Sequence, residues 1–165
     1  VEVTSGFRPS PDNSPFSYAT HAAVVAVDPD LGHVEILDYV ICEDCGTIVN
    51  PMIVDGQIVG GLLQGVGTAL FEESRYDDQG QPLSSTFADY TMPGPTHLPA
   101  VRLDHLVTPS PLTEFGVKGL GEGGAIPPPA AIANAVNDAL RGLGVELSET
   151  PISPRRVLAG IAAAP

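Results

Sequence analysis

The chain has 165 residues, which is enough for one domain with a hydrophobic core and too few for two large domains. Seven basic residues against 20 acidic ones give a net charge of −13, and a surface of this sign repels nucleic acid and anionic membranes. Because no apolar run of membrane-spanning length and no signal peptide is recognised, the sequence predicts a cytoplasmic protein without nucleic-acid or membrane partners.

The first part of the chain predicts an antiparallel hairpin after an extended lead-in. Residues 1–16 are rich in Ser, Pro and Asp and are expected to be extended or irregular. Two runs with alternating β-branched residues, 18–27 and 33–41, flank a turn signal at 28–32. The connection is longer than the tightest two-residue type of hairpin loop.

The middle of the chain predicts a helix followed by shorter elements. Asn50-Pro51 is expected to end the hairpin unit, and Asp55 to cap a helix that runs to about Ser74. Past this helix we expect a turn between short extended pieces and two strands, at 76–83, 87–90 and 101–107.

A second helix is predicted near the C-terminus. Three prolines at 127–129 lead into the apolar stretch 130–140, and Gly142 has the position of a C′ residue. The order hairpin, helix, strands, loop and helix predicts an α+β fold. We expect one domain portion over 17–156 and a C-terminal tail over 157–165.

The two cysteines, Cys42 and Cys45, form a Cys-x-x-Cys pattern without a second pair of ligands, although zinc needs about four. A redox dithiol usually begins a helix, whereas Gly46 and β-branched residues follow here. We interpret them as incidental thiols, with a redox or metal role as the less favoured alternative. Four dispersed histidines are expected to be structural or exposed: His21, His33, His97 and His105.

One side of the helix predicted after Asp55 has almost no side-chain bulk. On a helical wheel this side holds Gln57, Gly60, Gly61, Gln64, Gly67 and Thr68, opposite a broad apolar face. Since each glycine inside a helix costs up to about 1 kcal/mol, the stripe needs the close approach of another group as a compensating reason. That group is either another helix or strand, or a ligand that hydrogen-bonds the Gln amides.

A glycine-rich loop from Gly116 to Gly124 carries Glu122 and the chain's single lysine, Lys118, among five glycines. Such a loop exposes backbone N–H groups and can cradle an anionic ligand. It lacks the Gly-Lys-Ser/Thr ending of a P-loop and the strand–turn–helix frame of a dinucleotide fingerprint. Glu122 is either a shielded general base or one charge on a solvated surface loop.

Several segments in the same order resemble the molybdenum-binding subunits of the xanthine dehydrogenase and aldehyde oxidase family. They are Asp44-Cys45-Gly46, Asn50-Pro51, the stretch 55–67, the loop 116–122 and the helix 131–140. The similarity covers 17–156, which the resemblance identifies as a C-terminal portion of the molybdenum cofactor-binding domain. It is greatest for bacterial large subunits of the carbon monoxide dehydrogenase type.

The resemblance implies a molybdenum hydroxylase in which Glu122 matches the general base and Gln64 a glutamine that hydrogen-bonds the pterin. It further implies that four residues line the same site: Gly61, Lys118, Gly119 and Gly121. The implied cofactor is molybdopterin cytosine dinucleotide, whose dithiolene holds molybdenum without protein ligands. Partner subunits would carry 2Fe-2S clusters and FAD, and the substrate would be carbon monoxide, an aldehyde or an N-heterocycle.

One departure from the family pattern is Gly123-Gly124 after the Gly-Glu pair, where many members have Pro or Ser. We expect it to make the loop more flexible. We also expect the chain to share the cofactor with the remainder of the subunit and to be inactive alone. The alternative is a non-catalytic assembly module of the same fold, which uses the glycine stripe only for docking.

Overall fold

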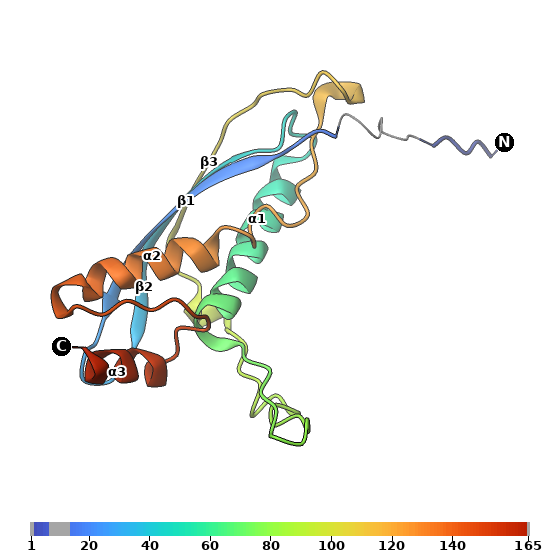
Figure 1. Ribbon diagram of the computed structural model, residues 1–165. Helices are drawn as coiled ribbons and strands as arrows, with labels where there is room; N and C mark the ends of the chain where they lie inside the picture. The colour runs from blue at the N-terminus through green and yellow to red at the C-terminus, as the bar shows by residue number, and fades with distance from the viewer. Residues whose placement is uncertain (1, 7–13, 165) are drawn as a thin grey trace.

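The computed structural model describes residues 2–6 and 14–164 and shows an α+β fold built on one sheet (Figure 1). The sheet contains β1 (Tyr18–Val27), β2 (Val34–Asp44) and β3 (Val101–His105), in this spatial order. β1 and β2 are antiparallel, whereas β3 runs parallel to β2. The predicted fold class, the hairpin and the strand after residue 100 are therefore confirmed.

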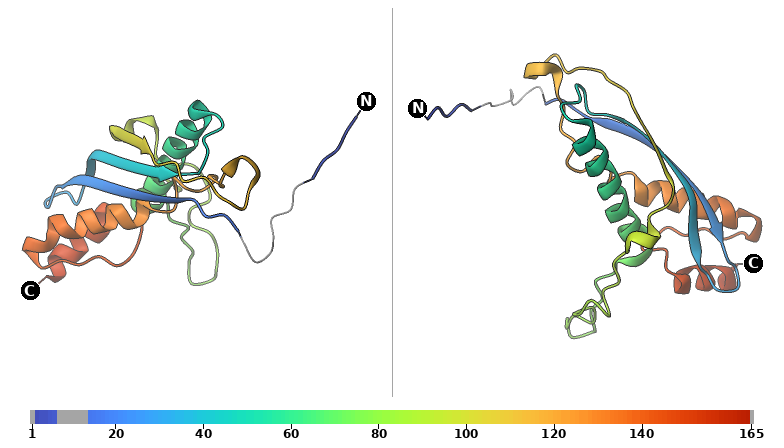
Figure 2. Two further views of the ribbon diagram at one scale, coloured as in Figure 1. Left: turned by 90° about the horizontal axis from the view of Figure 1, so that it is seen from above. Right: turned by 180° about the vertical axis from the view of Figure 1, so that it is seen from behind.

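In the described part of the chain, three helices accompany the sheet: α1 (Pro51–Val66), α2 (Pro128–Leu140) and α3 (Pro154–Ala163). α1 continues directly into a π-helical turn, η1 (Gly67–Phe71). α2 packs along β1 and against α1, as the two views of Figure 2 also show. Short 3-10 turns complete the elements at η2 (Pro95–His97), η3 (Glu114–Gly116) and η4 (Arg141–Leu143).

The start of α1 differs from the prediction that Asp55 caps this helix. The N-cap is Asn50, whose side-chain oxygen accepts a hydrogen bond from the backbone N–H of Ile53 at 3.4 Å. Pro51 then occupies the first helical turn, where its missing N–H is tolerated and its fixed φ favours the helix. Asn50-Pro51 therefore begins the helix, and Asp55 lies inside it.

The core lies between the inward face of the sheet and helices α1 and α2. Alternate residues of β2 point inward, and Tyr39 and Ile41 are fully buried. They meet one apolar stripe from each helix, which contributes about 1.5–3 kcal/mol per buried side chain. The buried helical residues are Ile58, Leu62 and Val66 of α1 and Ile132, Val136 and Leu140 of α2.

α1 and η1 together form an apolar helix of 21 residues, long enough by length and composition to cross a membrane. It is not a continuous apolar run, because Asp55, Gln57 and Gln64 lie within it. The apolar stripe, however, is buried against α2 and the sheet. This helix therefore has the packing of a core helix in the described chain.

Between η1 and β3 the chain forms an irregular segment that projects from the body (Figures 1 and 2). Tyr76 and Pro82 form a single bridge around a turn in which Gly80 has a φ of 79°, as the turn signal predicts. The strand predicted at 87–90 is wrong. A turn replaces it, because the Thr86 carbonyl accepts hydrogen bonds from the N–H groups of both Asp89 and Tyr90.

α2 ends at Leu140 as predicted, but Gly142 is not its C′ residue. The chain continues through η4, and Gly144 takes the left-handed conformation with a φ of 70°. α3 then crosses the domain boundary predicted after 156 and buries Val157 in the core. Residues 1, 7–13 and 165 lie outside the described part, so the lead-in expected over 1–16 is described only at 2–6 and 14–16.

Candidate functional site

Backbone contacts hold the loop that carries Glu122 against the residues that follow β2. Val117 forms an isolated bridge with Gly46, and the backbone N–H of Lys118 donates to the carbonyl of Cys45 at 2.9 Å. Gly46 has a φ of 71°, and a Cβ there would overlap the carbonyl oxygen of Gly116. The two segments approach closely because Gly46 lacks a side chain.

A buried ion pair anchors the same loop. The ammonium group of Lys118 donates to Asp44 Oδ1 at 3.1 Å and to Thr108 Oγ1 at 2.7 Å, and the two charged side chains are 9% and 0% exposed. Burial by itself raises the pKa of Asp44, but hydrogen bonds from Thr108, Gly46 and Lys118 hold it well below its ordinary range. The lysine side chain therefore holds the loop in place.

The glycine stripe of α1 is the surface on which this loop rests. A Cβ on Gly61 would lie 2.9 Å from Gly124, and a Cβ on Gly65 would lie 2.7 Å from Pro128. A Cβ on Gly124 would overlap the carbonyl oxygen of Ile58. Another segment of the chain thus explains Gly61 of the stripe and its neighbour Gly65, and the packing explains why a glycine stands at 124.

Gln57 adds a polar contact to this packing. Its amide nitrogen donates to the carbonyl oxygen of Gly121 at 2.8 Å, directly beside Glu122. This contact joins the predicted stripe to the predicted loop, which are 64 residues apart in the sequence.

Other parts of the stripe and loop remain open to solvent. Gln64 is exposed, and a Cβ on Gly60 would meet nothing within 4 Å. The same is true of Gly119 and Gly121 in the loop. These residues leave an amide group and backbone groups accessible to a ligand.

Glu122 lies in a turn that leads into α2. Its carbonyl accepts hydrogen bonds from the N–H groups of Ala125 and Ile126, at 2.9 and 3.2 Å. Its side chain is exposed and lines a cavity of about 560 Å³ with Phe16, Tyr18 and the loop backbone. A carboxylate held by its backbone beside a cavity is suited to exchange protons with a molecule bound there.

Glu43 lines the same cavity, although no sequence motif singles it out. It is 1% exposed, and no described residue donates a hydrogen bond to either carboxylate oxygen. Burial raises its pKa, nearby His105 opposes this effect and nearby Asp44 adds to it. The strand alternation carries the missed signal, because Glu43 follows Tyr39 and Ile41 on the inward face.

Asp55, predicted as a helix cap, instead accepts a hydrogen bond from His105. The distance from His105 Nε2 to Asp55 Oδ1 is 2.8 Å. This contact joins α1 to β3 at the end of the sheet where Glu43 lies, since Glu43 and His105 are partners in the β2–β3 register.

Cys42 and Cys45 are free thiols, and Cys45 is buried. Burial and the neighbouring Glu43 raise the pKa of Cys45, so this thiol keeps its proton and is a poor nucleophile. Within residues 2–6 and 14–164, no three His, Cys, Asp or Glu side chains lie close enough together to hold a metal ion.

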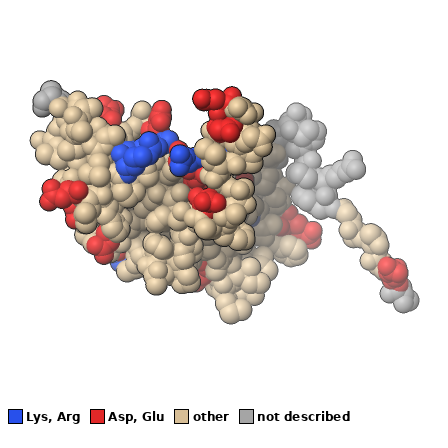
Figure 3. Space-filling view, turned by 90° about the horizontal axis from the view of Figure 1, so that it is seen from below, with Lys and Arg blue, Asp and Glu red and all other residues tan. Residues whose placement is uncertain are grey.

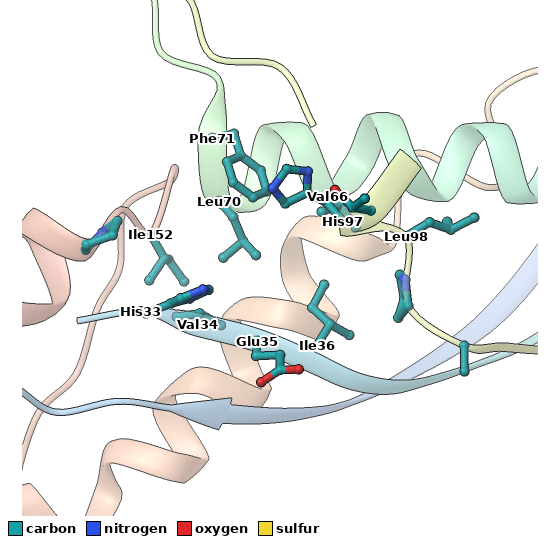
Figure 4. A pocket seen from close by; sticks show the side chains of 14 residues that line it. His33, Val34, Glu35, Ile36, Val66, Leu70, Phe71, His97, Leu98 and Ile152 are labelled. Carbon is teal, nitrogen blue, oxygen red and sulfur yellow. The ribbon is translucent and has the colours of Figure 1, made fainter. Parts of the chain in front are cut away.

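A second cavity, of about 590 Å³, lies between the start of β2 and the end of α1 (Figure 4). Val34 and Ile36 face Val66, Leu70 and Phe71 across it, and no candidate site residue lines it. Acidic side chains are spread over the surface seen in Figure 3, in keeping with the net charge of −13. Basic side chains gather in one small area of that view.

Residues 3–99 match the family described as molybdopterin cofactor-binding domain. The chain is 46% identical to the nicotine 6-hydroxylase large subunit of Paenarthrobacter nicotinovorans, over 87% of this chain and 18% of that protein. It is 36% identical to the carbon monoxide dehydrogenase large chain of Afipia carboxidovorans, over 78% of this chain and 16% of the relative.

The chain is also similar to solved structures. Quinoline 2-oxidoreductase from Pseudomonas putida 86 superposes with a TM-score of 0.86 at 46% identity, over 88% of this chain and 18% of that one. A Cu,Mo-CO dehydrogenase superposes with a TM-score of 0.80 at 33% identity, again over 18% of its length. The chain thus spans less than a fifth of these relatives.

Proposed function

Because the chain belongs to the molybdopterin cofactor-binding domains of xanthine dehydrogenase-type large subunits, we propose that it forms one wall of a molybdenum hydroxylase site with Glu122 as general base. The observation that carries this proposal is the placement of the Glu122 loop. The Lys118–Asp44 ion pair and the α1 glycines hold this loop beside a cavity. An assembly module would need a docking surface but no carboxylate in a cavity.

The residues present fit a pterin cofactor with polar edges. Gln64 offers an exposed amide, and Gly119 and Gly121 offer backbone groups that no Cβ shields. We propose these three as direct contacts. Gly61 and Lys118 contribute to the same site by holding the loop, since Gly61 packs on Gly124 and Lys118 pairs with Asp44.

In the proposed reaction Glu122 takes a proton from a water-derived oxygen as that oxygen attacks the substrate carbon. When bound, the molybdenum cofactor would supply the redox centre that accepts two electrons from the substrate. The loop fixes the backbone on both sides of Glu122, since Gln57 bonds Gly121 and the Glu122 carbonyl accepts two N–H groups. This anchoring keeps the carboxylate in a productive position between turnovers.

The substrate class we propose is an N-heteroaromatic ring. The nicotine 6-hydroxylase subunit and quinoline 2-oxidoreductase are each 46% identical to this chain, against 36% and 33% for the two carbon monoxide dehydrogenases. Phe16 and Ile126, which are 78% and 70% exposed, give the cavity apolar walls suited to a ring. Aldehydes and carbon monoxide are the competing substrates for a direct test.

Relatives are named as subunits or chains, including one of a 6-hydroxypseudooxynicotine dehydrogenase complex. We propose that partner subunits with 2Fe-2S clusters and FAD receive the electrons, and that the cofactor is the cytosine dinucleotide form. We further propose that the remainder of a large subunit completes the site and that the complex is cytoplasmic.

The test is Glu122→Gln in the assembled complex, with quinoline, nicotine, an aldehyde and carbon monoxide as trial substrates. Removal of a general base should lower turnover by about 10²–10⁴-fold, with molybdenum content unchanged. Glu114→Gln is the matched control, because Glu114 is exposed and lies outside the cavity. Near-normal turnover of Glu122→Gln would instead favour the assembly module.

A further inference from the structure

Glu43 is a carboxylic acid inside the protein with no described group to neutralise it. Its two oxygens are buried and accept no hydrogen bond from the described residues. Removing a carboxylate from water without a partner is strongly unfavourable. A buried carboxyl group without a partner costs stability, and the residues around Glu43 indicate which function offsets that cost.

Glu43 lies between the Glu122 loop and the end of β3. In the sheet its register partners are Ala19 on β1 and His105 on β3. Above it, a Cβ on Gly123 would lie 3.1 Å from Glu43 Oε1, so the carboxyl group sits against the residue next to Glu122. Glu43 and Glu122 line the same cavity.

His105 continues this arrangement toward solvent. Its Nδ1 is also buried and has no hydrogen-bond partner among the described residues, while its Nε2 bonds Asp55 at 2.8 Å. The His105 side chain is 21% exposed and that of Asp55 is 53% exposed. Both Glu43 and His105 therefore have buried polar atoms without partners among the described residues. On the opposite side of its ring, His105 contacts the part-exposed carboxylate of Asp55.

We propose that Glu43, His105 and Asp55 form a proton path that returns Glu122 to its ionised state after each turnover. The path rests on the proposed function of Glu122. Because none of the three residues is argued to touch the substrate, they act on the reaction only through the protonation of Glu122.

Each step transfers one proton and no electrons. Protonated Glu43 first gives its own proton to His105 at Nδ1 as the Nε2 proton passes to Asp55, which releases it to solvent. The Glu43 carboxylate left behind then takes the proton of Glu122 across the cavity that both line. Single bridging water molecules can close the gaps between groups that are not in direct contact. The imidazole regains its starting tautomer when the ring rotates and its Nδ1 proton is exchanged on the part-exposed side of the residue.

The surroundings of Glu43 favour its protonated form. The groups that face or adjoin it are His105 from β3, Glu122 from the loop, and Asp44 and Cys45 along its own chain segment. Asp44 is already paired with Lys118. Burial raises the pKa of Glu43 and so favours its protonated form, which makes Glu43 take up the proton of Glu122 once its own has passed to His105.

The experiment compares Glu43→Gln, His105→Gln and the control Glu146→Gln in the assembled complex, using whichever of quinoline or nicotine supports turnover. In Glu43→Gln and His105→Gln we expect a normal single-turnover rate and a steady-state turnover lower by at least about tenfold. The pH profile of steady-state turnover should also change. Glu146 is exposed and distant from the cavity, so its variant should match the unmodified complex. Infrared spectra recorded as the pH changes should lose one protonated-carboxyl band in Glu43→Gln alone.

Unchanged steady-state turnover and pH profile in both path variants would overturn the proton path. An unchanged protonated-carboxyl infrared band in Glu43→Gln would also overturn it. If Glu43→Gln fails to assemble, His105→Gln and its pH profile decide the matter, because His105 is part-exposed. Failure of the function itself has a different signature, since Glu122→Gln would then keep its single-turnover rate.

Discussion

At the scale of single residues, Lys118 shows how one side chain positions the site without belonging to the reaction. It is the chain's single lysine, and its ammonium group is committed to Asp44 and Thr108. A buried ion pair contributes little net stability, but removing one partner leaves an uncompensated charge. The loop that carries Glu122 therefore depends on both members of this pair.

Lys118→Met should destabilise the assembled complex by about 3–5 kcal/mol, because Asp44 stays buried and ionised. The double variant Lys118→Met with Asp44→Asn should recover part of that loss, since no charge then remains unpaired. Thermal unfolding of both variants measures the difference. Equal unfolding temperatures for the single and double variants would show that the pair does not hold the loop.

At the scale of elements, the contact between α1 and the Glu122 loop depends on glycines that allow close approach. Gly124→Ala should displace the loop, because its Cβ would overlap the carbonyl oxygen of Ile58, which is backbone and cannot move aside easily. We expect turnover to fall by at least about tenfold, since small misplacements of a base are costly.

Gly56→Ala is the matched control for this loop displacement. A Cβ on Gly56, which lies on the same helix, would meet nothing within 4 Å. Alanine should stabilise the helix there by up to about 1 kcal/mol and leave turnover unchanged. Steady-state kinetics and molybdenum content of both variants test the prediction, and equal turnover in the two would contradict it.

Local patterns in the sequence predicted the positions of these elements better than they predicted the contacts between them. The hairpin and α2 follow from alternation, turn residues and prolines, which are local signals. The start of α1 was misassigned because Asn50-Pro51 suits both the end of one unit and the N-terminus of a helix. The docking of Gly61 on Gly124 and the burial of Glu43 depend on contacts distant in sequence, which periodicity alone does not show.

At the scale of the whole molecule, the described residues form only one wall of the candidate site. Gln64, Gly119 and Gly121 are exposed, and the exposed apolar side chains of Phe16 and Ile126 line the same cavity as Gly119 and Gly121. The chain also spans only 18% of its 46%-identical relatives. A cofactor bound here would be enclosed only if other protein covered the opposite side.

We therefore expect molybdenum and a pterin cofactor in this chain purified with its natural neighbours, and neither in the chain purified alone. The physical reason is that hydrogen bonds from one exposed wall compete with water and give weak binding, whereas enclosure removes that competition. Metal analysis and nucleotide release on denaturation provide the measurement, with circular dichroism as a control that the isolated chain is folded. A folded isolated chain that retains molybdenum would show that this wall suffices. Molybdenum in neither preparation would leave the family resemblance without its cofactor and favour a role in assembly.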